Sequence, residues 1–139
     1  MSSPRSSELL DKARDAAQRA YAPYSNFPVG AALALADGRV ITGCNVENAS
    51  YGLGICAERT AVTRAVTTAD TSHPPRIEAV AIVGLKAAGK PCAPCGACRQ
   101  VLHEFGCSTV IVEDDGEPRE LDFATQILPL AFGPEDVKE

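Results

Sequence analysis

Several residue types and patterns are scarce in this chain of 139 residues, and each scarcity excludes a class of protein. No apolar run approaches the roughly 18 residues of a membrane-spanning helix, so a membrane span is not expected. The net charge is −5 and no window gathers lysine or arginine, which argues against DNA or RNA as a partner. Tryptophan is absent, so a ring-stacking site must use another aromatic residue. His73 and His103 each lack a second histidine at ligand spacing and are expected at the surface.

Cysteine is too rare for a disulfide scaffold, yet common enough to need an explanation. Six cysteines in 139 residues are about 4%, against roughly 8–10% in small disulfide-rich chains. Residues 1–15 are mostly polar and charged and contain no secretory hydrophobic segment. We therefore expect a cytoplasmic protein with reduced thiols. Metal binding or catalysis is the first role to test for these cysteines.

Hydrophobic periodicity predicts a single α/β domain over residues 1–139. No repeat or linker divides the chain, and residues 1–5 are expected to form a loose tail. Apolar residues at helical spacing predict a first helix over 8–22. Ser6 or Ser7 is its expected N-cap, because a serine hydroxyl can accept a hydrogen bond from the free N–H groups of the first turn.

The later elements alternate between strand and helix. Asp37-Gly38 lies between two apolar runs and predicts a β-hairpin. The predicted strands span 29–36, 39–44, 77–85, 109–112 and 119–122, and the predicted helices or helical turns span 57–69, 95–105 and 123–128. This order predicts a three-layer α-β-α sandwich around a mixed sheet of about five strands. The strands at 77–85 and 109–112 are expected to be parallel neighbours, because a helix joins them.

Two cysteine motifs begin the predicted second and third helices. The first is Cys56-Ala57-Glu58, and the second contains Cys95 and Cys98, which face the same way on a helix. A helix N-terminus favours the thiolate, which is the form that binds a metal. If the two helix starts meet, three sulfurs can hold zinc with one position open, as in catalytic zinc sites. Glu58 is then placed to take a proton from water in that position.

Simpler interpretations compete with this zinc site. Cys95 and Cys98 have the spacing of a thioredoxin-like redox pair. Cys92 lies three residues before Cys95, so it could complete a structural four-sulfur zinc module together with Cys56. Glu58 could serve only as a favourable charge in the first turn of a helix. The spacing of these residues leaves all three interpretations open.

Five segments, in a fixed order over nearly the whole chain, form a more specific pattern. They are Tyr24-Ser-Asn-Phe-Pro-Val-Gly30, Gly43-Cys-Asn-Val-Glu-Asn-Ala49, Cys56-Ala-Glu-Arg-Thr-Ala61, Pro94-Cys-Gly-Ala-Cys-Arg-Gln100, and Leu128-Pro through Phe132-Gly-Pro134. With them the chain resembles the small homotetrameric cytidine deaminases, which belong to the cytidine and deoxycytidylate deaminase family. The cysteine motifs also match the general pattern of the zinc nucleobase deaminases, in which His or Cys, then x, then Glu precedes Pro-Cys-x-x-Cys.

The resemblance implies a fold, a reaction and a cofactor. The fold is cytidine deaminase-like, and the reaction is hydrolysis of cytidine and 2′-deoxycytidine to uridine and 2′-deoxyuridine, with release of ammonia, in pyrimidine salvage. The implied cofactor is Zn²⁺, with no organic cofactor, and the implied partners are a nucleoside and three further copies of the chain. A blasticidin-type aminohydrolase is the nearest alternative enzyme, and the structural four-sulfur zinc module is the alternative that is not an enzyme.

The resemblance also implies roles for individual residues. Asn45 and Glu47 combine an amide with a carboxylate, a pair that suits hydroxyl groups, and by resemblance they bind the ribose. Phe27 is implied to stack on the pyrimidine, and Ala57 to present main-chain groups to the edge of the base. The other implied residues are Cys56, Cys95 and Cys98 as metal ligands, Glu58 as the catalytic acid–base, Arg59 as a partner of the thiolates, and Tyr51 and Phe132 as residues that reach a neighbouring subunit's pocket.

Overall fold

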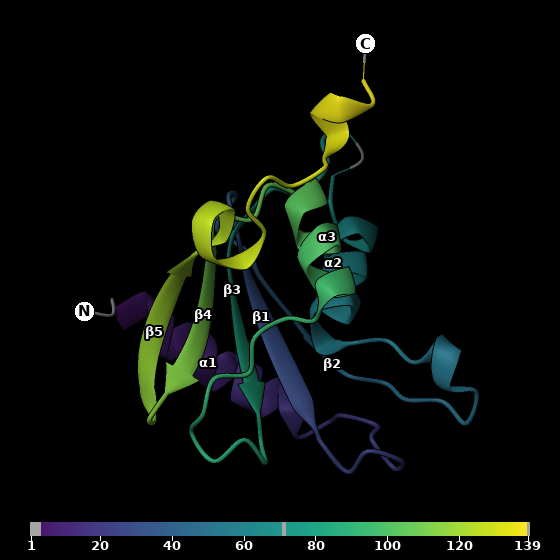
Figure 1. Ribbon diagram of the computed structural model, residues 1–139, viewed down its shortest axis with the longest axis vertical. Coiled ribbons are helices and arrows are strands. Elements are labelled where there is room, and N and C mark those ends of the chain that lie inside the picture. The colour runs from purple at the N-terminus through teal and green to yellow at the C-terminus, as the bar shows by residue number, and fades with distance from the viewer. Residues whose placement is uncertain (1–3, 71, 139) are drawn as a thin grey trace.

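The fold is built on one five-stranded mixed sheet. The computed structural model describes residues 4–70 and 72–138, and the strand order is β2-β1-β3-β4-β5 (Figure 1). The strands are β1 (Val29–Leu35), β2 (Val40–Cys44), β3 (Ile77–Gly84), β4 (Thr109–Asp114) and β5 (Glu117–Asp122). The β3–β4 pair is parallel, and the other three pairs are antiparallel. The predicted α/β class, the predicted strands and the parallel pair are therefore confirmed.

Helices cover both faces of this sheet, as predicted. They are α1 (Pro4–Ala17), α2 (Ala57–Thr67) and α3 (Gly96–Glu104), with shorter turns η1 (Tyr51–Leu53), η2 (Phe123–Ile127) and η3 (Pro134–Asp136). In Figure 1, α1 crosses one face of the sheet, and α2 and α3 lie side by side over the other. None of the described helices is long and apolar enough to cross a membrane.

The alternation of side chains along the strands explains the three layers. Successive residues of a strand point to opposite faces of the sheet. In β1, Ala32 and Ala34 join a buried cluster with α1, whereas Leu33 and Leu35 join a second cluster that includes residues of α2 and α3. A strand that is apolar on both faces must be covered on both, which is why β1 and β3 are central strands.

The start of the chain differs from its prediction. The first helix is α1 (Pro4–Ala17) and not 8–22, so residues 4 and 5 belong to the helix and not to a loose tail. Residues 1–3 lie outside the described part. Neither serine is the N-cap: Ser6 is buried inside α1, and its hydroxyl lies 2.6 Å from a carboxylate oxygen of Glu120. Proline in the first turn suits a helix start, because its missing N–H has no helical partner there.

Gly30 allows α1 to pack directly on β1, which leads to a stability prediction. A Cβ at Gly30 would lie 1.9 Å from the carbonyl oxygen of Ala13 and 2.5 Å from the backbone nitrogen of Ala17. Because both atoms belong to the helix backbone, Gly30→Ala should force α1 away from the sheet. We expect a loss of about 1–3 kcal/mol in the free energy of unfolding. Urea unfolding measures it, with Gly52→Ala as the control because a Cβ there meets no atom within 4 Å; equal midpoints for the two variants would contradict the prediction.

Candidate metal and catalytic site

Three cysteine sulfurs meet where α2 and α3 begin. Cys56 is the N-cap of α2, Cys95 is the N-cap of α3, and Cys98 is buried in the first turn of α3. The Cys95 and Cys98 sulfurs are 3.4 Å apart, and the Cys56 and Cys95 sulfurs are 3.8 Å apart. All three lie within 4.8 Å of one another, so the structure brings together the three predicted ligands.

These separations fit a tetrahedral zinc ion. Zinc–sulfur bonds of about 2.3 Å at tetrahedral angles require sulfur atoms about 3.8 Å apart. The sulfur separations of 3.4 and 3.8 Å are close to that value. Because only three thiols take part, a bound ion keeps one position for water or substrate, which is the difference between catalytic and structural zinc sites.

The surroundings of the sulfurs act on their ionisation in opposite directions. Burial opposes ionisation of Cys95, but hydrogen bonds from the backbone and side chain of Cys98 and from Cys56 outweigh it and lower the pKa of Cys95. Burial raises the pKa of Cys98, and the nearby carboxylate of Glu58 raises it further. A metal ion is the group that best stabilises three adjacent thiolates, because it replaces mutual repulsion with coordination.

Glu58 lies beside this cluster and is almost fully buried, with 4% of its surface exposed. It is the second residue of α2, so the same turn that presents Cys56 also presents this carboxylate. Burial raises the pKa of Glu58, while the helix backbone, Arg59 and Cys98 act against that rise. A carboxylate whose pKa is shifted toward neutral pH exchanges protons efficiently in both directions.

Arg59 supplies positive charge to the cluster. Its Nη2 donates to the sulfur of Cys56 at 3.4 Å, and its hydrogen bonds with Cys56 and Cys98 raise the pKa of the guanidinium. Three thiolates around a divalent ion carry a net charge of −1, so a fixed cation at this point reduces the excess negative charge. The implied role of Arg59 beside the thiolates agrees with this geometry.

Cys92 does not join the three-sulfur group, and this weakens the four-sulfur alternative. Among the described residues the group consists of Cys56, Cys95 and Cys98 alone. Burial raises the pKa of the Cys92 thiol to about 11, and the charge of Glu58 adds to the rise. Cys92 therefore lies within electrostatic reach of Glu58 but outside the group of sulfurs that could share one ion. The redox-pair alternative leaves Glu58 and Cys56 without a role.

Phe27 and Asn45 lie close to this neighbourhood. A Cβ at Gly84 would meet the Phe27 ring at 3.0 Å and the Cys92 sulfur at 3.4 Å, so the ring and the thiol lie against the same end of β3. Phe27 is 37% exposed, and that leaves surface on which a planar ligand could stack. Asn45 holds this segment in place: its Oδ1 accepts from the N–H of Val29, and its Nδ2 donates to the carbonyl of Phe27.

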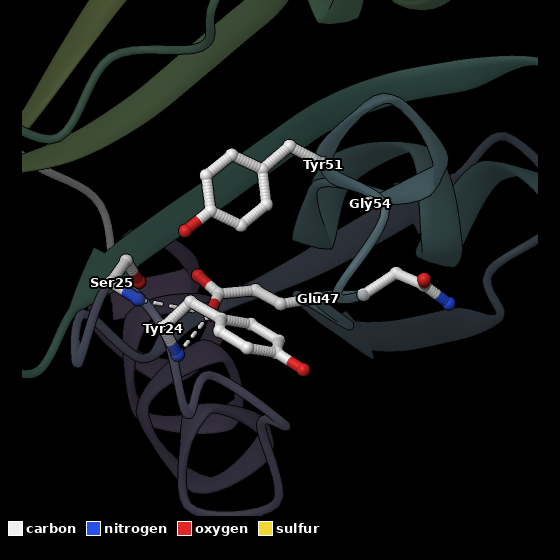
Figure 2. Close-up of a pocket in the computed structure, with 6 residues that line it drawn as sticks. Tyr24, Ser25, Glu47, Tyr51 and Gly54 are labelled. Carbon is white, nitrogen blue, oxygen red and sulfur yellow. Dashed lines mark hydrogen bonds between the residues drawn. The ribbon is translucent and has the colours of Figure 1, made fainter.

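Glu47 contributes to a separate pocket of about 270 Å³ (Figure 2). Its Oε1 accepts from the backbone N–H groups of Tyr24 and Ser25 at 2.9 and 3.0 Å. Hydrogen bonds from the side chain and backbone of Ser25, together with the Tyr24 N–H, lower the pKa of Glu47. Its Oε2 has no partner among the described residues and is free to accept from a hydroxyl. Glu47 and Asn45 both bind the main chain of segment 24–29.

Tyr51 and Phe132 are both strongly exposed. Tyr51 is 79% exposed on η1, in a loop that projects from the body of the molecule in Figure 1, and its ring packs at 5.8 Å from that of Tyr24. Phe132 is 61% exposed, and its carbonyl accepts from Gln100, beyond the first turn of α3. His103 is not a plain surface residue, because its ring stacks on Phe123.

Some residues that shape the candidate site were not singled out by sequence reasoning. Tyr24 and Ser25 supply the N–H groups that orient Glu47, yet they stand in a segment whose sequence has no periodic pattern. Gly43 is a second example: a Cβ there would lie 2.8 Å from the carbonyl oxygen of Ala57 and 2.5 Å from the nitrogen of Ala61. The signal for these residues is their presence in the matched segments, since nothing in residue type alone marks them.

Gly43→Ala is predicted to damage the site more than the fold. The added methyl group would push on the first turn of α2, which carries Cys56, Ala57 and Glu58, and a misplacement of about 1 Å at a catalytic group can cost about 100-fold in rate. We expect a loss of activity of that order, in a steady-state assay, with a loss of about 1–3 kcal/mol in stability. Full activity in a destabilised Gly43→Ala protein would contradict the prediction.

Three thiols that could hold a metal ion, beside a buried carboxylate at helix starts over one face of an α/β sheet, are the arrangement expected of a metal-dependent hydrolase. A family model described as "Cytidine and deoxycytidylate deaminase zinc-binding region" matches residues 3–114. The chain therefore belongs to the cytidine and deoxycytidylate deaminase family.

Relatives of known name support this membership over most of the chain. The cytidine deaminase of Mycobacterium tuberculosis (strain H37Rv) is 46% identical over 129 residues, covering 93% of this chain and 90% of the relative. The cytidine deaminase of Halalkalibacterium halodurans is 42% identical over 134 residues, covering 94% of this chain and 96% of the relative. The crystal structure of cytidine deaminase from Burkholderia pseudomallei has a TM-score of 0.78 at 46% identity, covering 91% of this chain and 98% of that chain.

Proposed function

We propose that the chain hydrolyses cytidine and 2′-deoxycytidine to uridine and 2′-deoxyuridine, with release of ammonia, at the site formed by the three cysteines and Glu58. The observation that carries this proposal is the convergence of Cys56, Cys95 and Cys98 beside a buried Glu58 in a member of this family. A structural zinc module needs neither the buried carboxylate nor an open fourth position.

Glu58 is the proposed proton carrier in this reaction. It takes a proton from the attacking water as the C4–O bond forms, and it passes that proton to N3 of the cytosine ring. It then carries the second proton of the water to the amine, the C4–N bond breaks, and ammonia leaves. Its burial suits this work, because a carboxylate away from bulk water exchanges protons with the substrate and not with solvent.

The proposed cofactor is Zn²⁺, held by Cys56, Cys95 and Cys98. A zinc ion supplies Lewis acidity, which makes water a nucleophile at neutral pH. The helix N-termini and Arg59 hold the sulfurs as thiolates and reduce the negative charge that three thiolates bring.

Two groups of residues are proposed to recognise the substrate: Phe27 and Ala57 bind the base, and Glu47 and Asn45 bind the ribose. Phe27 stacks on the pyrimidine with its exposed ring face, and Ala57 offers main-chain groups at the start of α2. Glu47 accepts from a ribose hydroxyl through Oε2, and Asn45 has one remaining N–H to donate after binding Phe27. Asn45 therefore has a double role, since the same amide also positions the segment that carries Phe27.

We further propose that the active form is a homotetramer. The pocket at Glu47 has about 270 Å³, just below the roughly 300–1,000 Å³ of small-molecule sites, so one chain encloses little of a nucleoside. Tyr51 and Phe132 are strongly exposed and available to complete a neighbour's pocket. Sedimentation velocity checks this directly: a species of four chains is expected, and a monomer with full activity would refute the assembly.

Cytoplasmic location and a role in pyrimidine salvage complete the proposal. All six cysteines are free thiols in the structure, as expected of a reducing compartment. The net charge of −5 suits a free nucleoside better than a polynucleotide.

The proposal is tested by ammonia release over a substrate panel. Purified protein with measured zinc content is supplied with cytidine, 2′-deoxycytidine, cytosine, adenosine or blasticidin S, and the change in ultraviolet absorbance is followed in parallel. Deamination of the two cytosine nucleosides, with little reaction of the free base or adenosine, is the expected result. Preferential deamination of blasticidin S would assign the chain to the other class of aminohydrolase, and zinc binding without any ammonia release would favour the structural module.

A further inference from the structure

Arg99 on α3 binds two segments of the main chain that are distant in sequence. Its Nε donates to the carbonyl oxygen of Pro94 at 2.8 Å, and its Nη1 donates to the carbonyl oxygen of Ile127 at 2.8 Å. One planar guanidinium therefore joins the segment just before Cys95 to the end of η2. This arginine takes no part in the proton transfers proposed above.

The bond to Pro94 acts on the segment that presents Cys95. Proline has no N–H, so its carbonyl is its only main-chain hydrogen-bonding group, and Arg99 binds it. The backbone N–H of Arg99 also donates to the carbonyl of Cys95 at 3.0 Å. The carbonyls of two successive residues, one of them a candidate metal ligand, are thus bound by a single residue of the following helix. The position of the Cys95 sulfur depends on this segment.

The bond to Ile127 acts on the C-terminal part of the chain. Ile127 is the last residue of η2, where a carbonyl has no partner within the turn, and its side chain is buried in the core. Five residues later, the carbonyl of Phe132 accepts from Nε2 of Gln100 at 2.8 Å. Neighbouring residues of α3, Arg99 and Gln100, therefore hold residues near the two ends of segment 127–133, which carries Phe132.

We propose that Arg99 is a positioning residue that couples the C-terminal segment to the Cys95 side of the metal site. The inference rests on the proposed zinc site. It adds that the rigidity of residues 127–133 determines how firmly Cys95 is held in position. Arginine suits this task because its donors lie in a fixed plane and its charge strengthens both bonds. Lysine, with a single ammonium group, cannot hold both carbonyls in this geometry.

The first test measures zinc affinity by competition with a chelator, using the full chain loaded with zinc. Removal of groups that orient metal ligands typically weakens metal binding by about 10–100-fold, and we expect Arg99→Met to fall in this range. Arg99→Lys should give an intermediate loss, and it replaces Arg99→Met if that variant does not fold. The matched control is Arg64→Met, which removes an arginine bonded at 3.1 Å to the Thr42 carbonyl, away from the metal site.

The second test is hydrogen exchange of the same proteins, read over segments 92–98 and 123–133. Arg99→Met should accelerate exchange in both segments, whereas Gln100→Ala should accelerate it in the C-terminal segment alone. Zinc affinity within twofold of the unsubstituted protein, or faster exchange in only one segment of Arg99→Met, would overturn the coupling. If the unsubstituted protein binds no zinc, the proposed function fails instead, and hydrogen exchange alone decides whether Arg99 joins the two segments.

Discussion

Replacing Glu58 by glutamine should lower kcat for cytidine deamination by about 10²–10⁴-fold while zinc stays bound. Glutamine has nearly the same shape, so it can occupy the buried position on α2. It cannot accept and return a proton, and the reaction needs this at three atoms in turn: the water oxygen, N3 and the leaving amine. The measurements are steady-state kinetics and the zinc content of the same preparation.

The control for this variant is Glu104→Gln, at the last residue of α3, which is expected to keep full activity. Thermal unfolding of both variants shows whether a lost activity reflects a lost fold. A Glu58→Gln protein that keeps its zinc and deaminates cytidine at the unsubstituted rate would show that the proposed proton carrier is wrong. Loss of zinc together with activity would assign Glu58 a role in holding the metal.

Replacing Cys95 by serine should remove stoichiometric zinc and lower activity by more than about 100-fold, because even groups that only orient metal ligands contribute about 10–100-fold. Serine is a favourable N-cap, so α3 should still begin at the same residue. The change therefore removes a thiolate while it preserves the N-cap of α3. Zinc is measured by metal analysis after dialysis and activity by ammonia release.

Cys92→Ser provides the matched comparison, since it makes the same chemical change three residues earlier. The thiol of Cys92 is outside the three-sulfur group, so the variant should keep its zinc and most of its activity. A protein that loses zinc on Cys92→Ser but keeps it on Cys95→Ser would reverse the assignment of ligands. Equal zinc loss in both variants would favour the four-sulfur structural module.

The parts of the fold that the sequence predicts well are those determined by local chemistry. The Asp37-Gly38 pair forms the expected hairpin between β1 and β2, with Gly38 at φ +94°, a backbone conformation that glycine adopts at low cost. The apolar run of β3 and the cysteine-led starts of α2 and α3 lie within a residue or two of their predicted bounds. Each depends on neighbours in sequence, which periodicity and turn residues describe directly.

The parts that sequence analysis missed depend on contacts between distant segments. Ser6 has the residue type of an N-cap, but its hydroxyl interacts with Glu120 on β5, a partner that no local pattern could indicate. Arg99 follows Cys98 and looks like an ordinary exposed helix residue until its bond to Ile127 is seen. The grouping of Cys56 with Cys95 was predicted only on the condition that α2 and α3 begin close together. Both helices lie side by side on the same face of the sheet, and this packing brings their starts together.

The sequence separation of 39 between Cys56 and Cys95 also bears on how the protein folds. The first half of the zinc site can form with the local β1–β2 hairpin and α2, but the second half waits for β3 to pair with β1 and for α3 to follow. Contacts of such long sequence separation form slowly, because the chain must close a large loop first. We therefore expect capture of the proposed zinc ion to be a late event in folding. A zinc-sensitive dye added during refolding would then report when β3 pairs with β1 and α3 reaches its place.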